Sequence, residues 1–347
     1  MKALRYYGPG DIRIEETPAP ELRAGEVMVQ VRSAGLCATD VKTFQRGHPK
    51  IQPGSVLGHE IAGIISEVNQ ADGWQVGDRV AVAPYAPCLD CPQCQQKSYS
   101  TCDRLMEEGI DPGGFSEYVR VSKRIVKQGL VRLPDDISFS MGALAEPIAC
   151  CLHGLEVLRL RAEDTLLIIG DGTMGLLQAL LAKKMGVRKI ILTGLIPDRL
   201  GKARAIADVV IDVGRQSLTE VLRKVAPSGA DKMMVSVGDP RVVESSMQYV
   251  GRSAIVNIYA GMPKGQMISL DPNLIHYNEV SLVGTFGFAP HHFHQAVGLL
   301  DSMRVDLNQI ISGTVSMELI STALMDMAEY RGIKYLVEFP AQPWGGV

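Results

Sequence analysis

The sequence has few aromatic residues and no long apolar run. Phe, Trp and Tyr make up 5% of its 347 residues, and the longest apolar stretches are far shorter than the ~20 residues that cross a bilayer. The net charge is only −3, which argues against a surface built for nucleic acid or anionic membrane. The N-terminus lacks the apolar run of a signal peptide. We therefore expect a soluble, cytoplasmic protein that acts on a small molecule, without a nucleic-acid or membrane partner.

Glycine is abundant, with 35 residues, and the length suits two domains. Segment 26–32 alternates apolar and polar residues as a half-buried strand does. After residue 134, short apolar runs typical of buried parallel strands alternate with helical segments. The expected strands are 165–169, 189–193, 209–212, 233–237 and 254–259, and the expected helices are 140–158, 172–185, 197–207, 217–225 and 293–303. We therefore expect an α/β protein, with a β-rich domain and a doubly wound parallel sheet.

A glycine-rich pattern, G-x-G-x-x-G, directly follows the first expected parallel strand. Its residues are Gly170, Asp171, Gly172, Thr173, Met174 and Gly175. Between a strand and a helix this pattern is typical of dinucleotide binding, because glycines let the backbone approach a pyrophosphate and the helix N-terminus attracts its charge. The alternative is an ordinary glycine-rich turn. We expect the pattern to bind NAD or NADP.

The next strand bears on the choice between those cofactors. An acid usually follows that strand and binds the adenosine ribose, but Thr193 and Gly194 hold the place here. No carboxylate would then repel a 2′-phosphate, and Arg199 and Arg204 are nearby cations, so the sequence favours NADP. The alternative is that Asp198 or a backbone group binds the ribose.

Four of the seven cysteines form a tight cluster, C-x2-C-x2-C-x7-C. They are Cys88, Cys91, Cys94 and Cys102. Four thiolates at such short spacing are typical of a closed tetrahedral Zn²⁺ site that stabilises a loop and leaves no position for catalysis. A 4Fe–4S cluster also uses four cysteines, and unligated thiols are a further alternative.

Several other candidate ligands stand apart in the sequence. Cys37 lies in GLCATD, His59 and Glu60 lie in GHE, and Glu146 lies in AEP. Taken singly, a buried Cys or His is usually a packing residue rather than a ligand. Their spacing alone therefore predicts no metal site.

Taken together, the motifs resemble a known family. The order GLCATD, GHEIAGII, VGDRV, CLDCPQC, GGFSEY, AEP and GDGTMG resembles that of the zinc-dependent medium-chain dehydrogenase/reductase family, along the whole chain, and its sorbitol (L-iditol) or polyol dehydrogenase-like branch in particular. The resemblance implies a GroES-like catalytic domain at 1–143 and 290–347 and a Rossmann cofactor domain at 144–289. It also implies a homodimer or homotetramer.

The resemblance assigns roles to the dispersed residues. It implies that Cys37 and His59 bind a catalytic Zn²⁺, that Glu60 and Glu146 are the acids of that site, binding directly or through water, and that Thr39 carries the hydroxyl beside the metal. Asp40 would orient His59. With the structural site, this gives two zinc ions per chain. The expected cofactor-binding residues are Gly170, Gly172, Thr173, Met174, Gly175, Gly194 and Arg199.

The implied activity is reversible hydride transfer between NAD(P) and a secondary alcohol of a polyol or sugar derivative. Sugar-alcohol-phosphate and threonine-type dehydrogenases remain alternatives, as does a non-catalytic NAD(P)-binding zinc protein. Lys42 stands where many relatives have a proton-relay His, and Lys42, Arg46, His48 and Lys50 place positive charge after the Cys37 motif. That charge favours a phosphorylated or carboxylated substrate, unless it simply belongs to a solvated loop.

Overall fold

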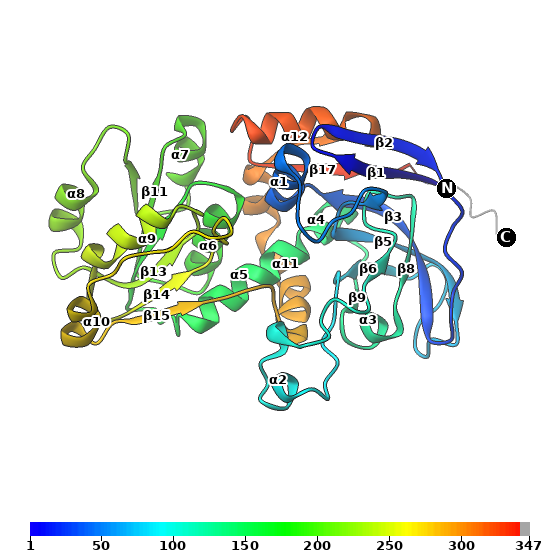
Figure 1. Cartoon of the computed structure of the whole chain (residues 1–347), viewed down its shortest axis with the longest axis horizontal. Helices are drawn as coiled ribbons and strands as arrows, with labels where there is room; N and C mark the ends of the chain where they lie inside the picture. Colours follow the sequence, from blue (N-terminus) through cyan, green and yellow to red (C-terminus); the bar gives the residue numbers. More distant parts are fainter. Residues whose placement is uncertain (341–347) are drawn as a thin grey trace. The chain divides into compact units, whose positions relative to one another are not determined.

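The computed structural model describes residues 1–340 and divides them into two compact units (Figure 1). The first unit holds Met1–Ala149 together with the chain from Phe288 onward, and the second unit holds Cys150–Gly287. Within the described residues, every helix is too short or too polar to span a membrane.

The first unit is built on two largely antiparallel sheets, in which only the β16–β17 pair is parallel among the described residues. In its described residues, the large sheet has the order β16-β17-β3-β5-β6-β9, with β8 also paired to β3 and to β7, and a small sheet has the order β2-β1-β4. The strands are β1 (Lys2–Gly8), β2 (Asp11–Glu16), β3 (Glu26–Gly35), β4 (Ser55–Val56), β5 (Glu60–Asn69), β6 (Arg79–Val82), β7 (Ile110–Asp111), β8 (Tyr118–Val121), β9 (Leu130–Arg132), β16 (Ile311–Val315) and β17 (Lys334–Glu338). The helices are α1 (Ala38–Arg46), α2 (Pro92–Gln95), η1 (Tyr99–Thr101), α3 (Lys123–Gln128), α4 (Phe139–Ala143), α11 (Pro290–Ile310), η3 (Met317–Leu319) and α12 (Ile320–Ala328).

Strand β3 organises this unit. Val27, Val29 and Val31 follow the period-2 spacing of a strand and all three enter the hydrophobic core. The strand pairs antiparallel with β5 on one side and with β17 on the other. A segment near the end of the chain therefore returns to the sheet that the first 70 residues begin.

The second unit is a parallel sheet with helices on both sides (Figure 1). Its strands are β10 (Thr165–Ile169), β11 (Lys189–Gly194), β12 (Val209–Asp212), β13 (Ala230–Val235), β14 (Val250–Ile258) and β15 (Ser281–Gly284). Its helices are α6 (Thr173–Lys184), α7 (Pro197–Ala203), α8 (Leu218–Val225), α9 (Pro240–Ser246), η2 (Met247–Tyr249) and α10 (Pro272–Asn278), while α5 (Ala145–Val157) contains the division between the units.

The strand order in this unit is β12-β11-β10-β13-β14-β15, with every pair parallel. This is the doubly wound Rossmann order 3-2-1-4-5-6, so the expected fold class is confirmed. All five residues of β10 are buried, as the continuous apolar run predicted. The chain reverses its direction across the sheet between β10 and β13, where such sheets bind ligands at the carboxyl ends of their strands.

Some element boundaries differ from the sequence prediction. The helix expected at 140–158 is broken into α4 and α5, because the N–H of Leu144 bonds to the carbonyls of Met141 and Gly142 and the regular helical register is lost there. Strand β13 begins at 230 instead of 233, and α11 extends well beyond 293–303. The local patterns gave the type of the elements that they predicted, while tertiary packing set the ends. Strand β15 and helices α9 and α10 were not predicted.

We predict that Gly175→Ala destabilises the protein by about 3 kcal/mol, as overpacking does. A Cβ at this position would lie 1.9 Å from the carbonyl oxygen of Gly170, so backbone must move. The matched control is Gly201→Ala in α7, where a Cβ meets nothing within 4 Å and removal of a helical glycine should stabilise by about 0.5–1 kcal/mol. Urea unfolding followed by circular dichroism measures both variants, and equal midpoints would contradict the prediction.

Candidate active site

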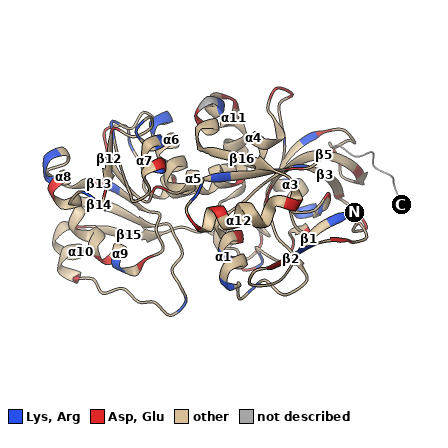
Figure 2. Ribbon diagram, turned by 90° about the horizontal axis from the view of Figure 1, so that it is seen from above, with Lys and Arg blue, Asp and Glu red and all other residues tan. Residues whose placement is uncertain are grey.

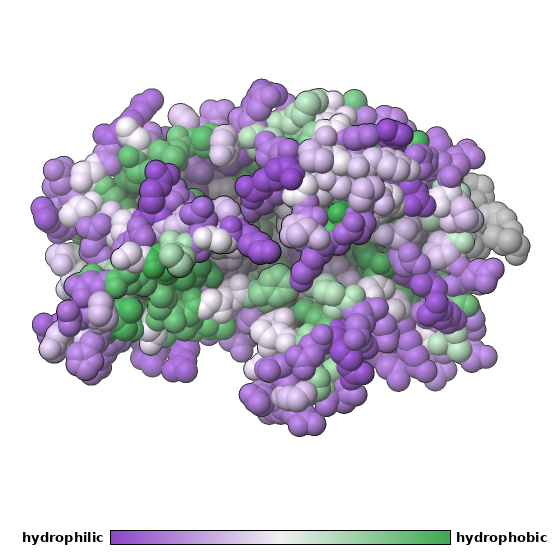
Figure 3. Space-filling model, in the orientation of Figure 1, coloured by the Kyte–Doolittle hydropathy of each residue, from purple (hydrophilic) through white to green (hydrophobic). Residues whose placement is uncertain are grey.

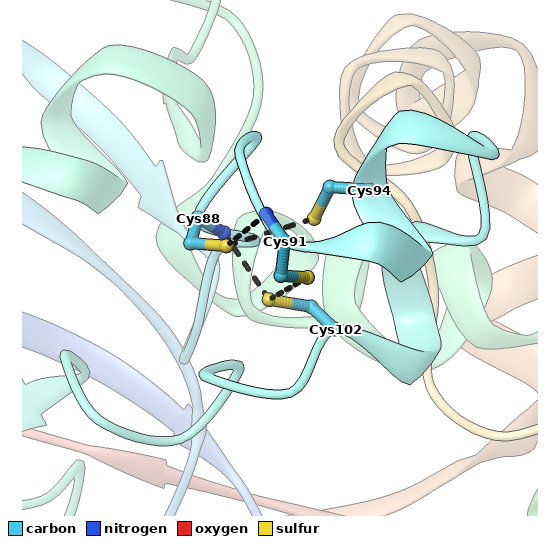
Figure 4. A group of neighbouring side chains, drawn as sticks. All are labelled: Cys88, Cys91, Cys94 and Cys102. Carbon is cyan, nitrogen blue, oxygen red and sulfur yellow. Dashed lines mark hydrogen bonds between the residues drawn. The ribbon is translucent and has the colours of Figure 1, made fainter.

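Four cysteine sulfurs converge in a loop of the first unit, as Figure 4 shows. Cys91 precedes α2, Cys94 lies within it and Cys102 ends η1. The four ligand atoms lie within 4.8 Å of one another. The sulfurs of Cys88 and Cys94 are 3.9 Å apart and those of Cys91 and Cys102 are 3.8 Å apart. Tetrahedral Zn–S bonds of about 2.3 Å require sulfurs roughly 3.8 Å apart, so the set fits a closed zinc site.

The protonation of these thiols also fits a bound cation. A backbone hydrogen bond from Cys94 lowers the pKa of Cys91 to about 6, whereas burial raises the pKa of Cys94 to about 12 and also raises that of Cys102. Near neutral pH the thiols of Cys94 and Cys102 therefore stay protonated unless a cation compensates the charge of their thiolates. A divalent ion provides that charge and turns them into thiolate ligands.

A second group of ligand atoms forms at one end of the large sheet. Gly35, the last residue of β3, lies opposite Glu60, the first residue of β5. The segments beyond these two strand ends therefore meet, and the ligand atoms of Cys37, His59 and Glu60 lie within 4.8 Å of one another. One sulfur, one imidazole and one carboxylate are the ligand types of a catalytic zinc, which keeps a further coordination position for water or substrate.

Negative charge surrounds the His59 ring. Burial lowers the pKa of His59, but Cys37, which is also its hydrogen-bond partner, raises the pKa together with Asp40 and Glu146, so that it lies well above its ordinary value. The pocket thus favours a positive charge beside the imidazole. A zinc ion would supply that charge in place of the proton, so these residues fit the metal.

Helix α1 begins beside this group, with Cys37 as its N-cap. Oδ2 of Asp40 accepts the N–H of Cys37 at 2.9 Å, and burial raises the pKa of this carboxyl group. Asp40 therefore fixes the backbone at Cys37. The resemblance implied that Asp40 orients His59, but among the described residues no hydrogen bond joins these two side chains. Thr39 is exposed in the same helical turn, two residues after Cys37.

Lys334, in β17, was missed by the sequence analysis. It is fully buried, forms an ion pair with Glu60 and donates a hydrogen bond of 2.9 Å to the carbonyl of Leu36. Burial lowers the pKa of Lys334, but Glu60 and Cys37 raise it more, and the net shift is upward. Gly35 leaves room for the pair, because a Cβ there would overlap the Glu60 carboxylate. The available signal was a lysine directly before the apolar run 335–337.

Glu146 lies outside the group of three ligand atoms. It stands in the first turn of α5 and is 7% exposed. Its charge still raises the pKa of both His59 and Lys334. A carboxylate in this position can serve a metal through a bridging water or through its charge.

The glycine-rich loop follows β10 in the second unit. Gly170 has φ +126°, a backbone conformation that suits glycine. Gly172 is the N-cap of α6 and has no side chain with which to cap it, and a Cβ at Gly172 would meet nothing within 4 Å among the described residues. Thr173 and Met174, partly exposed, begin the helix, and Gly175 packs against the loop. An uncapped helix start with open space beside it fits a dinucleotide pyrophosphate.

The end of β11 corrects one premise of the sequence analysis. Oδ2 of Asp171 accepts the N–H groups of Leu195 at 2.9 Å and Ile196 at 2.8 Å, so a carboxylate does lie at this strand end. Gly194 provides its space, since a Cβ there would lie 2.3 Å from that oxygen. Arg199 is buried, at 9% exposure. The sequence favoured NADP on the premise that no carboxylate lies at the end of this strand. That premise was wrong, because Asp171 of the glycine-rich loop places its carboxylate there.

Comparisons with known proteins agree with this geometry. The family model "Alcohol dehydrogenase GroES-like domain" matches residues 23–135, and the model "Zinc-binding dehydrogenase" matches residues 173–302. Sorbitol dehydrogenase of Bacillus subtilis (strain 168) is 29% identical over 339 residues, which cover 95% of this chain and 94% of the relative.

Two solved structures extend the likeness over nearly the whole fold. A Sinorhizobium meliloti 1021 protein assigned as a zinc-binding dehydrogenase, solved bound to NADP, has a TM-score of 0.90 and 28% identity, covering 97% of this chain and 99% of that one. Galactitol-1-phosphate dehydrogenase of Escherichia coli has a TM-score of 0.86 and 27% identity, covering 98% and 100%. The family resemblance of the motifs is confirmed: the chain belongs to the zinc-dependent medium-chain dehydrogenase/reductase family, in its sorbitol dehydrogenase-like branch.

Proposed function

We propose that this oxidoreductase interconverts a secondary alcohol of a polyol or sugar derivative and the corresponding ketone, with a nicotinamide dinucleotide as hydride carrier. The observation that carries the proposal is the meeting of Cys37, His59 and Glu60 within 4.8 Å. A structural zinc site has four protein ligands, whereas three ligands leave a coordination position open for water or substrate, as in a catalytic site. The relatives that are dehydrogenases of sorbitol and of galactitol 1-phosphate support the substrate class.

Each residue of the group has a proposed role. Cys37 and His59 hold the zinc ion, and Glu60 and Glu146 are the acids beside it. Zinc bound there supplies a Lewis acid that favours loss of the alcohol proton, and the nicotinamide supplies the redox chemistry. The exposed hydroxyl of Thr39, in the turn that follows Cys37, accepts that proton and passes it to solvent.

Positioning residues keep this arrangement in place. Asp40 fixes the backbone of Cys37 through its hydrogen bond. Lys334 fixes the carboxylate of Glu60 and neutralises its charge. The negative charges of the Cys37 thiolate, Asp40 and Glu146 then remain beside His59, and a divalent ion would offset them.

The two kinds of site belong to different proposed domains. The catalytic domain, 1–143 and 290–347, contains both groups of metal ligands, and the cofactor domain, 144–289, contains the glycine-rich loop; residues 341–347 lie outside the described part. The two compact units support this division. We propose two zinc ions per chain: a structural ion at the four-cysteine group and a catalytic ion at Cys37, His59 and Glu60.

We propose that the protein is a homo-oligomer, a dimer or a tetramer. Strand β15 is the outer strand of the parallel sheet among the described residues, and such an edge can pair with another chain. Figure 3 shows apolar surface in the region of β14 and β15. Tyr277 in α10 and Phe286 after β15 are 75% and 61% exposed. Contiguous apolar surface of this kind is typical of protein contacts.

A sugar-alcohol phosphate is the second candidate substrate. Lys42 and Arg46 are exposed one turn apart on α1, the helix that Cys37 caps, and Lys50 is exposed soon after it. Elsewhere, acidic and basic residues are interspersed among the elements of each unit (Figure 2). A cationic stretch next to the proposed zinc ligand suits a substrate phosphate. Comparing kcat/KM for polyols, their phosphates and threonine distinguishes these substrate classes.

We predict that Cys37→Ala and His59→Ala each abolish turnover, because each removes a zinc ligand. Dinucleotide binding should remain, since the glycine-rich loop lies in the other unit. The assay is nicotinamide absorbance with a panel of polyols and their phosphates and with both cofactors. The control is His276→Ala, an exposed histidine in α10. Full activity of either ligand variant would refute the assignment.

Metal content gives a separate prediction. Elemental analysis of the purified protein should find two zinc ions per chain in the wild type and one in Cys94→Ser, with weaker thermal stability because structural zinc contributes folding free energy. Cys150→Ser, outside both ligand groups, should keep two. One ion in the wild type, lost with Cys94, would favour a non-catalytic binding protein instead.

A further inference from the structure

The acid beside β11 has an unusual origin. In dinucleotide-binding sheets, the carboxylate that binds the adenosine ribose usually follows the second strand, about 20 residues after the glycine-rich motif. Here that strand ends in Thr193 and Gly194, while Asp171 occupies the second position of the motif itself. The carboxylate of Asp171 nevertheless reaches the same strand end, because its Oδ2 accepts hydrogen bonds from Leu195 and Ile196.

The fold holds this carboxylate firmly. Asp171 is only 8% exposed, and its two backbone donors are the residues that lead into α7. A Cβ on Gly194 would lie 2.4 Å from the Cβ and the carboxyl carbon of Asp171, so glycine at the end of β11 is what admits the aspartate. Both residues lie in the second unit, and their relation depends only on packing within it.

One oxygen of the carboxylate is left for a ligand. Within residues 1–340, Oδ1 of Asp171 accepts no hydrogen bond and no basic side chain forms an ion pair with the group. The backbone donors of Leu195 and Ile196, which could otherwise bind a phosphate, are already used. The strand end therefore presents negative charge with an open acceptor, which suits ribose hydroxyl donors and opposes a phosphate.

We propose that Asp171 determines cofactor specificity: its carboxylate binds the adenosine ribose hydroxyls of NAD and repels the 2′-phosphate of NADP. This inference rests on the proposed function, since it requires that the glycine-rich loop binds a nicotinamide dinucleotide. It assigns the chain to NAD, although the sequence alone favoured NADP. Gly194 contributes to the same specificity, because a side chain at this position would overlap the Asp171 carboxylate.

The test is direct binding. Titration of the purified protein with NADH and with NADPH, followed by nucleotide fluorescence, should give a dissociation constant for NADH at least about tenfold below that for NADPH. Asp171→Asn keeps the shape and an acceptor oxygen but removes the charge, and should reduce this preference by about tenfold or more, mainly through tighter NADPH binding. Gly194→Ala, which displaces the aspartate, should shift the preference in the same direction.

Asp164→Asn is the matched control. Asp164 is 9% exposed, and its Oδ2 accepts the backbone N–H of Arg161 at 2.8 Å, but it precedes β10 at the opposite end of the strand from Asp171. This variant should leave the ratio of the two dissociation constants unchanged. An unchanged ratio in Asp171→Asn, with the fold intact by circular dichroism, would show that Asp171 is only a structural cap and would overturn the inference.

Ionic strength tests the wild type without any substitution. Salt screens a repulsion between Asp171 and the 2′-phosphate, so NADPH binding should improve relative to NADH binding as salt is raised. A basic phosphate pocket would give the opposite trend. Preference for NADPH, or that opposite trend, overturns this inference alone, whereas failure to bind either nucleotide overturns the proposed function as well.

Discussion

Negative charge gathered at one end of the large sheet is the constraint on which the proposed zinc site of the first unit depends. The antiparallel pairing of β3 with β5 brings Cys37, His59 and Glu60 together, and Glu146 adds its charge to the same place. Buried charge costs free energy unless opposite charge accompanies it. Lys334 supplies one positive charge from the neighbouring β17, and a divalent ion would supply the rest. The register of β3 and β5 therefore determines where negative charge collects and where a cation would stabilise the fold.

Close backbone approach is the corresponding constraint in the cofactor unit. Gly170 and Gly175 bring the loop against the start of α6, and Gly194 brings the end of β11 against Asp171. The glycine-rich loop therefore has two effects. It leaves the N-terminus of α6 without a side-chain cap, where a pyrophosphate can bind. It also places the carboxylate of Asp171 at the end of β11, where an acid that follows β11 itself is usual. On our proposal, the choice between NAD and NADP is made by the side chain of Asp171, which lies within the glycine-rich loop.

Local sequence signals predicted five of the six described strands of the parallel sheet, because features such as the buried run at β10 depend on neighbouring residues only. The edge strand β15 was missed. The partners of the site residues could not be predicted in this way. Lys334 lies 274 residues from Glu60, and a strand pairing had to be known before their contact could be seen. Asp171 was overlooked for a similar reason, since the usual rule searches for the acid about 20 residues later. The break between α4 and α5 depended on packing around Leu144.

The most direct test of the central claim is anomalous X-ray diffraction at the zinc edge from crystals of the purified protein. We expect a peak among the four cysteines of the loop and another bound to Cys37 and His59, with a Zn–S distance of about 2.3 Å and a Zn–N distance of about 2.0–2.1 Å. A zinc peak confined to the four-cysteine loop, with the sulfur of Cys37 and the ring of His59 turned apart, would contradict the account.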